Sequence, residues 1–249
     1  MKTLVIVKEI IDTNKAVGLD KFNQIDSKDA DFVANIYDEY AIEEALRLKE
    51  KHGGEVVLYS LGSIGTLKTM GYVGAMGVDR IVLIDSKAKN SKDVSESLSK
   101  FITEHDGDFD LILCGHVGIN NNNGQVPGRM SRILDLPFIN VVSKLQIEDR
   151  QVLCEKEGEV YQEVVESSLP AVITVQRGIN EPRKPTASRI MQMDESMFEV
   201  IKDSREYSGG PMITYEHPKE RKDPFMIQEN SSLEAVDLLI EKLIDDKVL

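Results

Sequence analysis

The chain has 249 residues, of which 30 are Lys or Arg and 43 are Asp or Glu, giving a formal net charge of −13. This length predicts one large α/β domain, or one domain with an appendage, and either can bury a sizeable core. The acidic balance argues against nucleic acid or an anionic membrane surface as the main partner. Two widely spaced cysteines favour neither a disulfide framework nor a zinc site, and no apolar run reaches the length of a membrane span. We therefore expect a cytoplasmic protein without nucleic-acid partners or membrane insertion.

Short β-branched runs alternate with segments of helical period from Lys2 to about Val175. This alternation is typical of a parallel sheet that helices cover on both faces. The predicted strands are Leu4 to Val7, Val56 to Ser60, Arg80 to Ile84, Leu111 to Cys114, Phe138 to Val142 and Ala171 to Val175. The expected fold is a doubly wound, mostly parallel α/β sheet, Rossmann-like and similar to the adenine nucleotide alpha hydrolases.

Apolar spacing predicts the helices between these strands. The clearest covers Asp38 to Lys51, carries one apolar stripe and stops at Gly53-Gly54. Two more helices are marked by Leu67, Met70 and Val73, and by Val94, Leu98, Phe101 and Ile102. An antiparallel hairpin added to the sheet is predicted by alternating residues over Leu145 to Glu148, Val152 to Lys156 and Val160 to Val165.

The composition changes after Pro182. Residues 184 to 228 carry four prolines, mixed charge and few long apolar runs, which favours an extended arm. The chain then closes with Ser232 to Leu249, where Leu233, Val236, Leu239, Ile240 and Leu243 line one helix face behind a Ser cap. We predict a core domain over 1–183 and, over 184–249, an arm with an amphipathic helix that either folds back or embraces another subunit.

A loop rich in Gly and Asn, Gly115 to Gly128, connects the strand at Leu111 to Cys114 with a following helix. Gly and Asn tolerate positive φ, so successive backbone N–H groups can point into one concavity, to which the helix adds its positive dipole end. Pro127 suits the first helical turn. The loop therefore predicts a phosphate site, although an ordinary strand-to-helix turn would use the same residues.

Three stretches together resemble the β subunit of electron-transfer flavoprotein. They are Val7-Lys8-Glu9-Ile10-Ile11-Asp12-Thr13, then Asn35-Ile36-Tyr37-Asp38-Glu39-Tyr40-Ala41-Ile42-Glu43-Glu44-Ala45-Leu46, and finally Leu169-Pro170-Ala171-Val172-Ile173-Thr174-Val175 with Asn180-Glu181-Pro182-Arg183. The resemblance covers essentially the whole chain. It implies an electron-transfer subunit without a catalytic site of its own, paired with a larger α subunit that holds the redox FAD.

The resemblance also implies an adenine nucleotide at the carboxyl ends of the strands, as is usual for open parallel sheets. The implied nucleotide contacts are Ile6, Asn35, Ile36, Tyr37, Asp38, Leu61, Gly115, His116, Val117, Gly118, Ile119, Asn120, Asn121, Asn122, Asn123, Gly124, Gln125 and Val126. Asn35 and Asp38 are also candidates for helix capping. Thr13 is expected to lie toward the other flavin or to be a plain turn residue.

The resemblance leaves two nucleotides open. Members that relay single electrons hold AMP, whereas bifurcating members hold a second FAD that exchanges hydride with NADH. Residues 120–127 share Gln125-Val126 with the bifurcating pattern, but asparagines replace both of its aspartates and Pro127 replaces a glycine. Because Asn removes like-charge repulsion near a pyrophosphate, we expect FAD at this site, with AMP as the alternative.

The residues expected to anchor a dehydrogenase differ from those of the relay members. Their dehydrogenase anchor is a Leu that follows an Asn-x-Pro-Arg-Tyr segment, whereas this chain has Lys184 in place of the Tyr and Ala187 in place of the Leu. A truncated anchor fits a different pocket or binds weakly. We therefore expect one dedicated dehydrogenase, of acyl-CoA or 2-hydroxy acid type.

Two other classes remain as alternatives. A universal-stress-type nucleotide sensor would explain the sheet and the loop, but not residues 180–183 or the long arm. A hydrolase of the related nucleotide-binding fold would need a catalytic constellation, and His52, His105, His116 and His217 are scattered along the chain.

Overall fold

A computed structural model of the chain describes residues 1–15, 17–26, 30–207, 214–216, 224, 226–228 and 231–248. Residue contacts divide the chain into two compact units, Met1–Ile213 and Thr214–Leu249. Within the described residues, no helix combines the length and apolar character needed to cross a membrane. The two units are described separately below.

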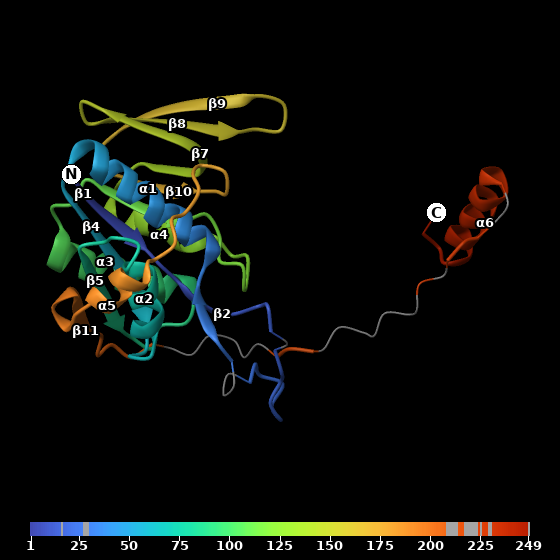
Figure 1. Ribbon diagram of the computed structural model, residues 1–249, viewed down its shortest axis with the longest axis horizontal. Helices are drawn as coiled ribbons and strands as arrows, with labels where there is room; N and C mark the ends of the chain where they lie inside the picture. Colours follow the sequence, from blue (N-terminus) through green and yellow to red (C-terminus); the bar gives the residue numbers. More distant parts are fainter. Residues whose placement is uncertain are drawn as a thin grey trace. The chain divides into compact units, whose positions relative to one another are not determined.

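The first unit is built on one large sheet (Figure 1). Over the described residues its strand order is β11-β5-β4-β1-β6-β10-β7-β8-β9. The strands are β1 (Lys2–Ile6), β4 (Glu55–Gly62), β5 (Arg80–Asp85), β6 (Leu111–Gly115), β7 (Phe138–Glu148), β8 (Gln151–Glu157), β9 (Gln162–Ser168), β10 (Ala171–Val175) and β11 (Phe198–Lys202). Pairing is parallel from β11 to β7 and antiparallel from β7 to β9. A separate ribbon pairs β2 (Glu9–Ile11) with β3 (Phe32–Ala34).

Helices cover both faces of the parallel part. They are α1 (Ile36–His52), α2 (Thr66–Gly74), α3 (Ser91–Asp106) and α4 (Gln125–Leu134). The apolar stripes of α1 and α2 pack on Val5 and Leu58, whereas α3 and α4 pack on Leu4 and Ile112. Strand neighbours thus point to opposite cores, as a doubly covered sheet requires. The predicted doubly wound fold is confirmed.

The predicted hairpin is present, but its first strand is not separate. The prediction placed one strand over Phe138 to Val142 and another over Leu145 to Glu148, and both belong to the single strand β7. Val141 has a φ of 56° and donates its N–H to the Thr174 hydroxyl at 2.9 Å. This local bend turns β7 from parallel pairing with β10 to antiparallel pairing with β8.

The segment expected to be an arm contributes to the sheet. After α5 (Ala187–Gln192) and the short helix η1 (Glu195–Met197), β11 pairs in parallel with β5 at the sheet edge. The sequence prediction did not include this strand. The reason is that β11 is only five residues long and is followed closely by Gly and Pro. The predicted domain boundary at 183/184 stays a prediction, and residue contacts divide the chain at 213/214.

The second unit contains α6 (Ser232–Asp245). Ser231 caps this helix by accepting a hydrogen bond from the Glu234 N–H at 3.2 Å, as the predicted Ser cap requires. None of its residues is buried, and the exposed apolar ones are Leu233, Val236, Leu239, Ile240 and Ile244. The predicted end of the helix, Leu249, and the parts 208–213, 217–223 and 225 of the predicted arm, with Pro211, His217 and Pro218, lie outside the described residues.

Candidate nucleotide site

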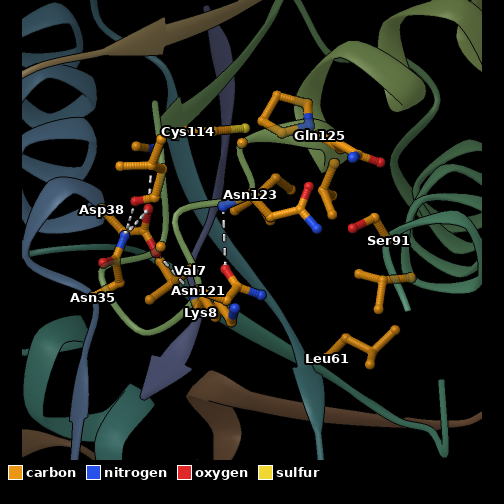
Figure 2. Close-up of a pocket in the computed structure, with 18 of the residues that line it drawn as sticks. Val7, Lys8, Asn35, Asp38, Leu61, Ser91, Cys114, Asn121, Asn123 and Gln125 are labelled. Carbon is orange, nitrogen blue, oxygen red and sulfur yellow. Dashed lines mark hydrogen bonds between the residues drawn. The ribbon is translucent and has the colours of Figure 1, made fainter. Parts of the chain in front are cut away.

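A cavity of about 240 Å³ lies where β1, β4, β5 and β6 end (Figure 2). Carboxyl ends of parallel strands are the usual binding edge of an open sheet. The predicted residues that line it are Ile6, Asn35, Asp38, Leu61, Gly115, His116, Val117, Gly118, Asn121, Asn123, Gly124, Gln125 and Val126. Segments far apart in the sequence therefore meet at one place.

The loop between β6 and α4 turns sharply at Gly124. This residue has a φ of 61° and is the N-terminal cap position of α4. A Cβ here would lie 3.1 Å from the carbonyl oxygen of His116, so the position favours glycine for both conformation and space. The Asn123 N–H donates to the Asn121 side chain at 3.4 Å, across the floor of the loop in Figure 2. The first turn of α4 then presents its N–H groups at the cavity, with Pro127 in that turn.

Asn35 holds the loop between β6 and α4 through two side-chain hydrogen bonds. Its side-chain amide donates to the carbonyl oxygen of Val117 at 2.9 Å and accepts from the Ile119 N–H at 3.2 Å. Although Asn35 is the N-terminal cap residue of α1, its side chain makes no capping bond. The alternative role of helix capping is therefore wrong for Asn35, because its side chain bonds to the loop instead.

Asp38 joins three segments at the back of the cavity. Its carboxylate accepts from the N–H groups of Lys8 at 2.8 Å and Gly115 at 3.0 Å, and from the Asn35 amide at 3.1 Å. Burial raises the pKa of Asp38 to about 7, while these donors act in the opposite direction. A Cβ on Gly115 would lie 2.4 Å from the Asp38 carboxylate, so glycine permits this close approach.

Six of the predicted residues do not line the cavity. The His116 ring, which does line the cavity, packs edge-on against Tyr37 with ring centroids 4.1 Å apart, and burial lowers the pKa of His116. Thr13 is exposed in a turn. The remaining ones, outside the cavity lining, are Ile36, Tyr37, Ile119, Asn120 and Asn122. Tyr37 and Asn120 instead support residues that line it, through the ring contact and through a bond to Lys8.

Sequence reasoning missed the residues after β1, Val7, Lys8 and Glu9, and one whole wall, together with Cys114 and Pro127. Lys8 follows β1, lines the cavity and donates from Nζ to the Asn120 side chain at 2.9 Å. The wall comes from the loop after β5 and the start of α3. Its residues are Ala88, Lys89, Ser91, Val94 and Leu98. The signal that could have found them is the rule that ligands bind at the carboxyl ends of several neighbouring strands.

The chemistry of the lining suits an anion attached to an apolar group. Backbone N–H groups, Lys8 and Lys89 offer donors and positive charge, whereas Ile6, Leu61 and Val94 offer apolar surface. In the described part of the chain, His, Cys, Asp and Glu side chains do not gather in a group able to hold a metal ion.

Comparison with known protein families identifies the fold that carries this site. Residues 23–199 match the model of the electron transfer flavoprotein domain. The chain belongs to this family. The match spans the loop at 115–126 and the start of α1, so both parts of the cavity lie inside the electron transfer flavoprotein domain.

Curated relatives agree with this assignment. The chain is 35% identical over 203 residues to the electron transfer flavoprotein subunit beta of Bacillus subtilis, covering 81% of this chain and 79% of the relative. It is 36% identical over 193 residues to the subunit of the same name from Syntrophomonas wolfei, covering 77% and 75%. It is 28% identical over 204 residues to the caffeyl-CoA reductase-Etf complex subunit CarD of Acetobacterium woodii, covering 80% and 78%.

Proposed function

We propose that this chain is the β subunit of a heterodimeric electron transfer flavoprotein, with an adenine nucleotide in the cavity at the carboxyl edge. The observation that carries the proposal is the loop from Asn123 to Val126, which opens α4 and is fixed by Asn35 and Asp38. The Asn123 N–H is bonded to Asn121, and the three successive backbone N–H groups of Gly124, Gln125 and Val126 at the helix start provide an anion cradle. The family assignment supports this role over those of a stress-type sensor or a hydrolase.

The cavity fits the part that AMP and FAD share. Its volume of about 240 Å³ lies just below the usual range of about 300–1,000 Å³ for small-molecule sites, which suits a ligand no larger than an adenosine phosphate. Leu61 and Val94 provide an apolar wall for the adenosine, and Lys8 and the loop N–H groups provide donors for phosphate. The isoalloxazine of an FAD would extend beyond this cavity.

We propose FAD as the nucleotide, with AMP as the alternative. Residues 120–123 are all asparagine, so this part of the loop brings no carboxylate toward a pyrophosphate. The similarity to a subunit whose name places it in a reductase-Etf complex favours a bifurcating role. A bound FAD supplies electron-transfer chemistry that AMP lacks, with NADH as the donor of hydride in this proposal.

Two features support the proposed protein partners. They are the apolar helix of the second unit and the residues near 184 that differ from the relay members. The exposed apolar stripe of α6 is suited to docking on a larger α subunit, which would hold the other flavin. Lys184 and the exposed Ala187, at the start of α5, favour one dedicated dehydrogenase of acyl-CoA or 2-hydroxy acid type. In the cytoplasm the chain would carry electrons to that dehydrogenase, without a catalytic site of its own.

Counting nucleotides tests the choice of cofactor. The chain is co-purified with its α subunit, the complex is denatured, and FAD and AMP are separated by anion exchange and counted per αβ unit. About two FAD per unit are expected, together with flavin reduction by NADH without added dehydrogenase. One FAD and one AMP would overturn the bifurcating role and leave the β-subunit role standing.

Deleting α6 tests the docking surface. Removal of residues 232–249 should abolish co-elution with the α subunit in size-exclusion chromatography and lower the flavin absorbance of the complex. As a matched control, Lys242→Ala changes the same helix outside its apolar stripe and should leave co-elution intact. Unchanged association after the deletion would contradict the docking role of this helix.

A further inference from the structure

Asp203, immediately after β11, is a buried carboxylate that joins several segments. Its side chain is 1% exposed. Its oxygens accept from the Ser97 hydroxyl at 2.8 Å, the Ser86 hydroxyl at 3.0 Å, Arg205 at 2.9 Å through both Nε and Nη2, and the Tyr207 hydroxyl. Burial acts to raise the pKa of Asp203, but the bonds from Arg205, Tyr207 and Ser97 outweigh it and hold the pKa far below its usual range.

Two of these donors, Ser86 and Ser97, lie next to residues that form the wall of the nucleotide cavity. Ser86 begins the loop between β5 and α3, and its hydroxyl also accepts from the Ala88 N–H at 3.2 Å. Ser97 lies on α3, one turn after Val94. Ala88 and Val94 both line the cavity. Asp203 therefore bonds directly to the loop between β5 and α3 through Ser86. Through Ser97 it bonds to α3 one turn after Val94 of the cavity wall.

We infer that Asp203 is a positioning residue for nucleotide binding, which fixes the wall after β5 at the edge of the cavity. The inference rests on the proposed nucleotide site. A charge buried to this degree is tolerated only when it is fully paired and hydrogen-bonded, so its geometry is tightly fixed. Whatever it holds is fixed with it, including Ala88 through Ser86.

The same carboxylate also anchors residues 205–207, which lead toward the second unit. Arg205 donates its backbone N–H to Oδ1 at 3.2 Å in addition to its two side-chain bonds. Nucleotide binding and the attachment of this segment thus share one anchor. By linkage, a change that frees Tyr207 from Asp203 should weaken nucleotide binding, and bound nucleotide should protect the segment from exchange.

The other end of α3 provides a matched control. Asp106 is also 1% exposed, and it accepts from the Tyr59 hydroxyl and pairs with Arg80 at 2.5 Å and Lys2 at 2.7 Å. It is thus a carboxylate with the same burial and similar partners, but it lies outside the cavity lining. Asp106→Asn and Asp203→Asn should both destabilise the fold, and only the second should affect the nucleotide.

The test measures AMP binding to the full chain by isothermal titration calorimetry, with urea unfolding in parallel. We expect Asp203→Asn to raise the AMP dissociation constant about tenfold or more, and Tyr207→Phe and Ser86→Ala to raise it severalfold. Asp106→Asn should change the AMP dissociation constant by less than about twofold. It should lower the urea midpoint of unfolding by as much as Asp203→Asn does. Hydrogen exchange with AMP present should show protection of residues 86–94 in Asp106→Asn and its loss in Asp203→Asn.

The outcomes separate the two proposals. If the unmodified chain does not bind AMP or FAD, the nucleotide site itself is overturned. If it binds, and affinity and protection in Asp203→Asn match those in Asp106→Asn, Asp203 is structural only. Where Asp203→Asn does not fold, Ser86→Ala and Tyr207→Phe decide: unchanged affinity in both overturns the positioning role.

Discussion

The two ends of the sheet bury polar groups in different ways. At the amino end, Asp106, Arg80, Lys2 and Tyr59 satisfy one another, side chain to side chain. At the carboxyl end, Asp38 accepts from the backbone N–H groups of Lys8 and Gly115, and Asn35 bonds to the backbone of the loop after β6. A closed cluster has no donors to offer a ligand, whereas a braced loop keeps its own N–H groups directed outward. The same strands thus carry a closed polar cluster at one end and, at the other, the loop that we propose to bind nucleotide.

The largest effect should come from Gly124→Val. The side chain would meet the His116 carbonyl and force a β-branched residue to a φ of 61°. We expect nucleotide to be lost completely on gel filtration. Gly53→Val is the control, since Gly53 has a φ of 70° with open space around it and lies at the amino end. Retained nucleotide in Gly124→Val would disprove the position of the cradle.

Asp38→Asn should give the next largest effect. An amide in place of the carboxylate turns a donor toward the N–H of Lys8 or Gly115, which leaves buried donors unpaired. We expect about 3 kcal/mol less stability in urea at pH 8 and weaker AMP binding. Both quantities should fall together, unlike in Asp106→Asn. A stable variant without affinity loss would show that the brace is not needed.

A smaller effect is expected from Gln125→Ala. Its side-chain carbonyl already accepts from Arg129 Nε at 3.1 Å, which leaves the amide as the donor to a phosphate. The loss should be about 1.5 kcal/mol in AMP affinity, the lower end for a charged hydrogen bond. Titration calorimetry measures it, with Arg129→Met as the control for the helix contact. An equal loss in both variants would assign the effect to that contact.

A further effect concerns the pH dependence of stability. The pKa of Asp38 is raised from 3.8 to about 7 in the folded chain. The stability that protonated Asp38 adds to the fold is therefore fully present below pH 3.8 and is lost as the pH rises through 7. Unfolding free energy should therefore fall more steeply between pH 5 and 7 in the unmodified chain than in Asp38→Asn. Urea titrations across this range give both slopes, and equal slopes would refute the shift.

Sequence patterns predicted the parts of the fold whose signal is local. The stripe of α1 and the buried run of β6 each identify their element within a dozen residues, and both are present. By contrast, β11 is a short edge strand whose pairing with β5 depends on residues more than a hundred positions away. The residues of the cavity also differ in whether a local pattern predicts them. The loop at Gly124 was found from its Gly and Asn content, whereas Lys8 and Asp203 carry no local signature.

The exposed edge of the added hairpin has a consequence for self-association. β9 ends the strand order, so its outer main-chain groups resemble a template for another strand. Glu163 and Glu166 lie along this short strand, in a chain with a formal charge of −13. Two copies that approached edge to edge would bring these carboxylates together, and such repulsion opposes cross-β pairing. Glu163 is also paired with Lys156 at 3.5 Å, so Glu166 and the overall acidic balance carry most of this repulsion at the edge, which no other strand pairs among the described residues.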